Sequence, residues 1–213
     1  MEHLTVLPHY AKRFNEPEYS PSQELLSAFS SMLAANGDIP DYLADKVANI
    51  HILNLAGSKG AKQQRILNDL VDFEGLQALN LAGNSRARWA TIHPSMKRLK
   101  MRNTRTDTDF YYSTLPKLRY LDLESTDTCT DQLIPHELHA EFENLKTLNI
   151  SWTPVEDFTP EIFPRLRHFS TCCSEFDWPW VRGLNLETLE VHHSMRTTEP
   201  ADLSVGRVIY RRN

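Results

Sequence analysis

Two pairs of side chains in this sequence are of the types that bind metal ions, Cys172-Cys173 and His192-His193. Thiolate sulfur and imidazole nitrogen are the ligands that zinc prefers in proteins. These four residues are therefore weak candidates for a zinc site, and the alternative is two ordinary surface pairs. The catalytic and cofactor motifs GxGxxG, GxxxxGK(S/T), GxSxG, HExxH and CxxC do not occur. We therefore expect a protein that is not an enzyme and that carries no cofactor.

A cluster of charged and aromatic side chains is the second group that could form a site. Its members are Lys97, Arg98, Lys100 and Arg102, followed later in the chain by Tyr120, Asp122 and Glu124. Arg and Tyr are residue types that contribute much of the energy at protein interfaces. A run of charges is equally consistent with a solvated surface. The choice between the two depends on how the fold positions these segments.

The sequence contains an internal repeat, and the fold of this repeat would position the charged and aromatic side chains. The segments Leu53-Asn54-Leu55-Ala56-Gly57-Ser58 and Leu79-Asn80-Leu81-Ala82-Gly83-Asn84 are nearly identical, and Ile50 and Leu76 precede their first leucines by three places. This defines a template with apolar residues at positions 1, 4 and 6. Further matches begin at Met96, Leu118, Leu145, Leu166, Leu186 and Val205. The starts lie 19 to 27 residues apart, a spacing close to that of leucine-rich repeats, which run to about 20–29 residues.

Two further columns of the repeat support this register. Position 9 holds only Ser, Thr or Asn: Ser58, Asn84, Thr104, Thr126, Thr153, Ser174 and Ser194. Short polar side chains there can bond to backbone groups where the chain bends out of its strand. Three residues before position 1, an apolar column contains Val47, Phe73, Leu115, Phe142 and Phe163. We expect this column to stack between coils as a spine that is interrupted at His93, Gly183 and Asp202.

The pattern LxxLxLxx(N/S/T) over residues 47–210 resembles that of the leucine-rich-repeat family. The resemblance implies an α/β solenoid of seven or eight repeats over residues 47–213, with a curved parallel sheet on the concave face and helices and turns on the convex face. Residues 1–46 are expected to form an N-terminal helical cap, because Ser20-Pro21-Ser22-Gln23 has the form of a capping box. Helical spacing also predicts convex helices over Lys62–Phe73 and, more weakly, Asp131–Phe142.

The convex side departs from the family pattern. Position 11, which is usually apolar in the family, is polar or glycine in five repeats: Gly60, Arg86, Thr106, Thr128 and Arg196. We therefore expect the convex side to be irregular.

We expect the concave face to carry the side chains that do not point into the core. Side chains alternate along a strand, so positions 1, 4 and 6 point inward and positions 2, 3, 5, 7 and 8 line the concave sheet. The basic third repeat then lies beside the aromatic-acidic fourth. The predicted partner-binding residues are Lys97, Arg98, Lys100, Arg102, Tyr120, Asp122, Glu124, Asn149 and Trp152. In the same register Cys172 would lie beside His192, and Cys173 beside His193.

A rigid repeat face without catalytic motifs predicts a non-catalytic module that binds another protein, as an adaptor or as a subunit of a complex. One alternative is an inhibitor or immunity-type protein that blocks a single enzyme. Another is nucleic-acid binding through the basic third repeat, which the formal net charge of −5 and the neighbouring acids oppose. Three cysteines, an odd number, favour a reducing, cytoplasmic environment. No apolar run has the length of a membrane span.

Overall fold

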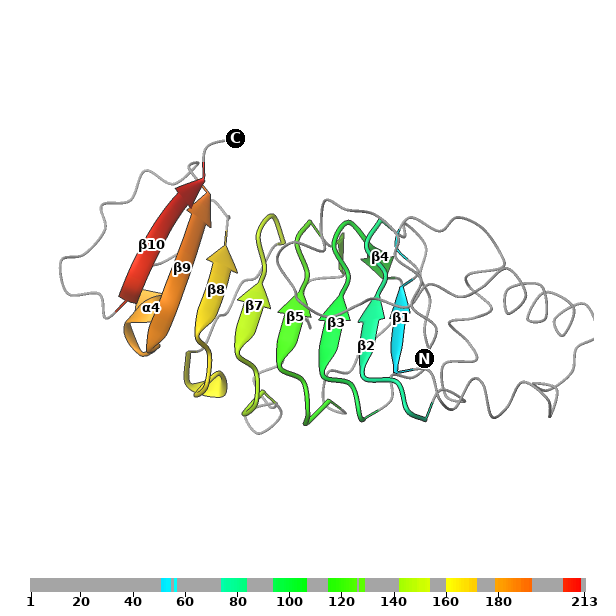
Figure 1. Cartoon of the computed structure of the whole chain (residues 1–213). Coiled ribbons are helices and arrows are strands. Elements are labelled where there is room, and N and C mark those ends of the chain that lie inside the picture. The colour runs from blue at the N-terminus through cyan, green and yellow to red at the C-terminus, as the bar shows by residue number, and fades with distance from the viewer. Residues whose placement is uncertain are drawn as a thin grey trace, which may run out of the picture.

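Eight short strands form one parallel sheet, and they lie side by side in chain order (Figure 1). The computed structural model describes residues 51–54, 56, 74–83, 94–106, 115–125, 127–128, 142–153, 160–171, 179–192 and 205–211. The strands of the sheet are β1 (Ile52–Asn54), β2 (Ala78–Asn80), β3 (Arg98–Lys100), β5 (Tyr120–Asp122), β7 (Thr147–Asn149), β8 (His168–Thr171), β9 (Leu186–His192) and β10 (Val205–Arg211). Each template match coincides with one of these strands, so the molecule is a parallel-strand solenoid of the leucine-rich-repeat type.

The strands pair in the register that the template defines. Position-4 residues are Cα partners across the whole sheet, in the order Leu53, Leu79, Leu99, Leu121, Leu148, Phe169, Leu189 and Val208. The first seven of these side chains are buried, whereas the residues that flank them in β1, β2, β3 and β7 are half-buried. This alternation confirms that position 4 points into the core and that positions 3 and 5 point away from it.

The apolar column before β5, β7 and β8 forms the opposite wall of the core. Leu115, Phe142 and Phe163 are each 1% exposed. The rings of Phe142 and Phe163 are tilted, with their centroids 5.3 Å apart, an arrangement that aromatic pairs favour. The predicted spine is thus confirmed in the fourth to sixth repeats. Gly183, where we expected an interruption, is exposed, and Val181 on the short helix α4 (Pro179–Arg182) is buried in the next coil.

After β2, β3, β5 and β7, the chain leaves the strand through a tight turn at position 8. Among the described residues, those with positive φ are Gly83, Asn103, Ser125 and Trp152, with φ values of 78°, 52°, 52° and 60°. All four occupy position 8. Glycine and asparagine adopt this left-handed conformation readily, but a bulky side chain such as Trp152 rarely does.

Threonines at position 9 connect one coil to the coil before it. The Thr104 hydroxyl donates a hydrogen bond to the carbonyl of Leu81 at 3.0 Å, and the Thr153 hydroxyl donates to the carbonyl of Leu123. Both threonines are 1% exposed. These bonds give the polar column its physical reason, because each satisfies a backbone carbonyl inside the turn. The prediction for this column is confirmed at these two positions, and its other members lie outside the described residues.

The convex side is more regular in the third and fourth repeats than we expected. Strands β4 (Arg105–Thr106) and β6 (Asp127–Thr128) form a second, two-stranded parallel ladder. They occupy positions 10 and 11, immediately after the turn. Backbone hydrogen bonds between coils hold this ladder, so it does not need the apolar residue at position 11 that the family pattern has. A 3₁₀ turn, η5 (Pro160–Ile162), precedes β8.

Other predicted helices fall largely outside the described residues. The N-terminal cap over residues 1–46 and the helix over residues 62–73 lie outside them entirely, as does the helix over residues 131–142 apart from its last residue, Phe142. In the described part of the chain, no helix combines the length and the apolar character that crossing a bilayer requires.

Strand β10 lies at one end of the sheet. Its position-4 residue Val208 is half-buried, and its position-6 residue Tyr210 is 52% exposed. The inward-facing column is therefore less covered here than in the repeats before it.

Candidate functional site

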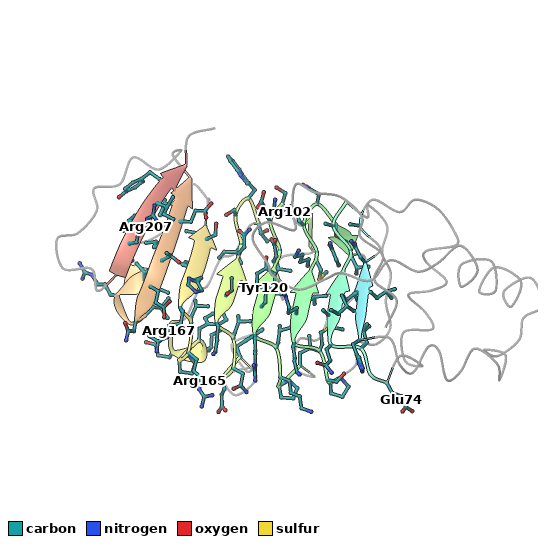
Figure 2. All side chains as sticks on the ribbon, viewed as in Figure 1. Glu74, Arg102, Tyr120, Arg165, Arg167 and Arg207 are labelled. Carbon is teal, nitrogen blue, oxygen red and sulfur yellow. The ribbon has the colours of Figure 1, made fainter. Side chains whose placement is uncertain are left out.

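The predicted contact residues gather at the middle of the sheet, on β3, β5 and β7 and the turns that follow them. Arg98, Tyr120 and Thr147 are neighbours in register, as are Lys100, Asp122 and Asn149. Figure 2 shows Tyr120 near the middle of the sheet and Arg102 toward the carboxyl ends of the strands. The register therefore brings the basic third repeat and the acidic fourth repeat into contact, as the sequence predicted.

Arg98 and Tyr120 form a cation–π pair across β3 and β5. The guanidinium carbon of Arg98 lies 5.2 Å from the centroid of the Tyr120 ring, which is within the range of a favourable interaction. The Tyr120 hydroxyl donates a hydrogen bond to Oδ2 of Asp122 at 3.2 Å. Burial of the ring, with a further contribution from the Asp122 carboxylate, raises the pKa of the Tyr120 phenol far above its ordinary value of 10.0. Tyr120 therefore stays protonated and acts as a donor.

Asp122 lies at the centre of the cluster and is 5% exposed. Its Oδ1 accepts the backbone N–H of Glu124 at 3.2 Å. Its Oδ2 lies 3.6 Å from a guanidinium nitrogen of Arg102. Burial raises the pKa of Asp122, and Arg102 and the Glu124 amide offset only part of that effect. The carboxylate is thus held by three partners in a place where its charge is poorly solvated.

Arg102 and Asn149 extend the cluster to a third strand. Arg102 forms a second ion pair with Glu124, and Nδ2 of Asn149 donates to Oε2 of the same Glu124 at 3.0 Å. The charges of Asp122 and Glu124 therefore lie against Arg102. We call the set Arg98, Arg102, Tyr120, Asp122, Glu124 and Asn149 the cross-strand network.

Position 5 has a backbone role that the sequence-based interpretation missed. In four repeats an Asn or Asp at this position accepts the backbone N–H of the residue two places later, at 3.0–3.2 Å: Asn54, Asn80, Asp122 and Asn149. This is the local bond that short amide and carboxylate side chains favour in turns. Four Asx residues in one column was the available signal. Asp122 and Asn149 therefore also stabilise their own turns.

Of the nine predicted contact residues, two are buried, six are half-buried and one is exposed. Tyr120 and Asp122, which the sequence placed on the concave sheet, are buried, 8% and 5% exposed, so they offer little surface to a partner. Arg98 lies over the Tyr120 ring, and Arg102 faces the Asp122 carboxylate. Tyr120 and Asp122 in turn hold these two arginines in place. Arg98, Lys100 and Arg102 are half-buried.

Two predicted contact residues lie at the ends of this region. Lys97 is half-buried, and its Nζ donates to Oε1 of Gln77 at 2.8 Å. Trp152 is 46% exposed. Trp152 lies in the turn after β7 and not on the flat sheet, because position 8 is where the chain turns.

The candidate metal ligands are largely outside the described residues. Strands β8 and β9 are in register up to Thr171 and Val191, and the backbone of His192 ends β9. Cys172, Cys173 and His193 lie beyond the described ranges. Among the residues that the structure describes, no three His, Cys, Asp or Glu side chains gather as a metal site would require. The four residues therefore stay weak candidates for a zinc site.

The cross-strand network has features that occur in active sites and in structural clusters alike. A buried acid beside a buried phenol, both with raised pKa values, is one such feature. Here the phenol bonds to the carboxylate, and the carboxylate bonds to a backbone amide and faces Arg102. Partners on several sides are typical of a network that rigidifies a surface.

Comparison with known proteins supports the fold and leaves the function to be argued from the site. No protein-family model matches the chain, and no curated protein matches it. A solved structure, that of internalin C2 from Listeria monocytogenes, is similar, with a TM-score of 0.57 and 16% sequence identity. The similarity covers 90% of this chain and 94% of the internalin chain. At this level of identity, the likeness extends to the arrangement of the backbone alone.

Proposed function

We propose that this chain is a non-catalytic module that binds a partner protein on its concave sheet, over β3, β5 and β7. The observation that carries the proposal is the cross-strand network. It fixes Arg98 over the Tyr120 ring and Arg102 against two carboxylates. A binding surface whose long side chains are already ordered loses less entropy when a partner docks.

The residues that would contact the partner are those that the network supports without burying. Arg98, Lys100 and Arg102 are half-buried and lie on the turn and strand of one repeat. Arginine is enriched among the residues that dominate interface energies. Tyr120 and Asp122 act as positioning residues beneath them. The partner surface that fits is mixed in charge, because basic β3 lies beside the acidic turn at Glu124.

Trp152 supports the same location. It is a large aromatic side chain, 46% exposed, in a left-handed backbone conformation with φ of 60°. An L-residue other than glycine pays roughly 1–2 kcal/mol for this conformation, and Gly83 occupies the equivalent position in the second repeat. Such strain persists where another requirement outweighs it. Aromatic contact with a partner at the end of β7 would be such a requirement.

Nucleic-acid binding through the third repeat finds less support. The positive charge of Arg102 faces Asp122 at 3.6 Å and also pairs with Glu124. Phosphate recognition needs cations whose charge is available to the phosphates. A partner with both acidic and basic groups therefore suits this surface better than a polyanion.

The proposal is tested by partner capture with paired variants. Affinity purification from the native source with mass spectrometry identifies candidates, and each candidate's affinity is then measured by calorimetry. The double variant Lys100→Glu/Trp152→Ala should lower affinity at least tenfold, because both side chains lie at the proposed contact. Arg102 is left intact, since its loss would leave the carboxylates of Asp122 and Glu124 without the cation that faces both of them.

The matched control is Glu161→Lys on η5, an exposed residue outside the three strands. It should leave the affinity unchanged. Circular dichroism should give native spectra for both variants. An unchanged affinity in the folded double variant, for every partner recovered, would refute the concave-sheet proposal.

A further inference from the structure

A row of basic side chains runs along the amino-terminal edge of the sheet, away from the cross-strand network. Lys97, Arg119, Lys146 and Arg167 all occupy position 2, one residue before β3, β5, β7 and β8. Backbone hydrogen bonds join them in sequence: Arg119 N–H to Lys97 O at 2.8 Å, Lys146 N–H to Arg119 O at 2.9 Å, and Arg167 N–H to Lys146 O at 2.9 Å. With strands about 4.8 Å apart, the four residues span about 14 Å.

Two further cations lie in the turns that lead into these strands. Lys117 and Arg165 are exposed two residues before Arg119 and Arg167. Figure 2 shows Arg165 and Arg167 together at the amino-terminal ends of the strands. We call Lys97, Lys117, Arg119, Lys146, Arg165 and Arg167 the basic rim. The row is bounded by uncharged Gln77 on one side and by Glu187 on the other, and Glu143 is the acid within it.

The charge of the basic rim is not neutralised within the described residues. Lys97 donates to the Gln77 amide oxygen at 2.8 Å, Arg165 to the Asn144 amide oxygen at 3.0 Å, and Arg167 to the Asn185 carbonyl at 3.2 Å. Those three acceptors are uncharged. No ion pair joins a rim residue to a carboxylate in the part of the chain described. Arg102, on the concave face of the same sheet, is paired with two carboxylates. The two basic surfaces therefore differ in how far neighbouring acids offset their charge.

We propose that the basic rim is a second docking surface, for an extended acidic segment of a partner protein. In an extended chain, side chains on one face recur every 6.6–6.8 Å, so acidic residues at i, i+2 and i+4 span about 13 Å. That length matches the four position-2 residues. The four position-2 residues lie on hydrogen-bonded backbone, so the sheet fixes the spacing of their Cα atoms. A cationic surface of this kind raises the encounter rate as well as the affinity.

A protein segment fits the rim better than a nucleic acid does. The chain carries a formal net charge of −5, and Glu187 ends the row after Arg167. A nucleic acid of ordinary length would extend past the rim into negative surroundings, whereas a short acidic segment would not.

The experiment uses the full chain and a labelled peptide with alternating Asp and Ser. Fluorescence anisotropy at low and at physiological salt measures its affinity, with the Asn-Ser peptide and a labelled single-stranded oligothymidine as comparison probes. The wild-type chain should bind the acidic peptide, more weakly as salt rises. Arg119→Glu/Lys146→Glu should weaken binding about tenfold or more, because each exchange removes one attraction and adds one repulsion.

The control variant is Arg182→Glu/Arg207→Glu, which makes the same change in net charge at two exposed arginines on α4 and β10. It should retain at least half of the wild-type affinity. Because charge reversal could impair folding, Arg119→Gln/Lys146→Gln serves as a second rim variant. Its affinity for the acidic peptide should lie between those of the wild type and the charge-reversed rim variant.

Equal weakening by the rim and control variants, or no binding of the acidic peptide to the wild-type chain, would overturn the proposal. Tighter binding of oligothymidine than of the peptide would overturn it in favour of nucleic acid. All of these variants keep Arg98, Lys100 and Trp152, so failure here is distinct from failure of the concave-sheet proposal.

Discussion

Exchanging a single atom group in Asn149 should show how much its contact with Glu124 contributes to the stability of the fold. Oδ1 of Asn149 accepts the Ser151 N–H at 3.0 Å, and Nδ2 donates to Oε2 of Glu124 at 3.0 Å. Asn149→Asp has almost the same shape. It keeps the acceptor for Ser151 and replaces the donor by a carboxylate oxygen that faces Glu124.

The expected loss of stability follows from that geometry. Two unit charges repel by roughly 4 kcal/mol at 4 Å and an effective dielectric of 20, a separation that the side chains reach by moving about 1 Å apart. The lost hydrogen bond to a charged group adds about 1.5 kcal/mol or more. Arg102, which pairs with Glu124, offsets part of the repulsion. We therefore expect Asn149→Asp to lower the free energy of unfolding by roughly 2–3 kcal/mol at pH 7.

The effect has a characteristic dependence on pH. The neighbouring carboxylate raises the pKa of the introduced carboxyl in the folded state. The folded variant then binds more protons than the unfolded variant in the interval above the ordinary pKa, so its relative stability increases as the pH falls. Urea denaturation between pH 4 and 7, with wild type and Asn149→Ala as references, measures this. Asn149→Ala should lose roughly 1–3 kcal/mol with no such recovery.

The outcome that would contradict the network is specific. If Asn149→Asp were as stable as the wild type at pH 7, Asn149 and Glu124 would not be in contact. If its loss did not shrink toward low pH, the loss would have another cause.

Two further predictions concern groups buried beside this site. Thr153→Val should cost roughly 1–2 kcal/mol in urea denaturation, because it removes the hydroxyl that bonds to the Leu123 carbonyl while keeping the side-chain volume; Thr153→Ser keeps the hydroxyl, and equal stability of Thr153→Val and wild type would contradict the inter-coil bond. Asp122→Asn should change the pH dependence of stability. Burial raises the pKa of Asp122 in the folded state above its ordinary value of 3.8, so the folded wild type binds the extra proton and gains stability relative to the variant as pH falls through that raised pKa toward 3.8. A difference between wild type and Asp122→Asn that stays constant from pH 7 to pH 4 would exclude this.

The fold could be predicted because the solenoid repeats one simple physical requirement. Each coil buries position 4 against the coils on either side, so the spacing of Leu79, Leu99 and Leu121 determines both the strand and its register. The polar position 9 was predictable for a similar reason, since the turn leaves a carbonyl that a short hydroxyl can reach, as Thr153 does.

For the candidate site, the pairing of its strands was predictable from the sequence, and the burial of its side chains was not. Register alone brings Arg98 to Tyr120 and Lys100 to Asp122. Burial of Tyr120 and Asp122 depends on how the arginine side chains fold across the face, and periodicity carries no information about rotamers. The second role of Asp122, as acceptor for the Glu124 amide, appears in sequence as an Asx column, a pattern that is equally consistent with a polar surface.

The basic rim was missed for a different reason. Its members lie only one or two per repeat, so no window of the chain is unusually basic around Arg119 or Lys146. Only Lys97 belonged to a visible cluster. Reading the position-2 column across repeats was the signal that could have found it.

The order of the strands has a consequence for how such a protein can change over time. Neighbours in the sheet are neighbours in the chain from β1 to β10, with β4 and β6 set apart, so each strand of the sheet pairs only with the strands of the coils before and after it. Duplicating the coil of β7 would add one strand and one more position to the basic rim, and deleting a coil would shorten both by the same step. Recombination that adds or removes whole coils would therefore lengthen or shorten the basic rim, while the packing within each remaining coil stays the same.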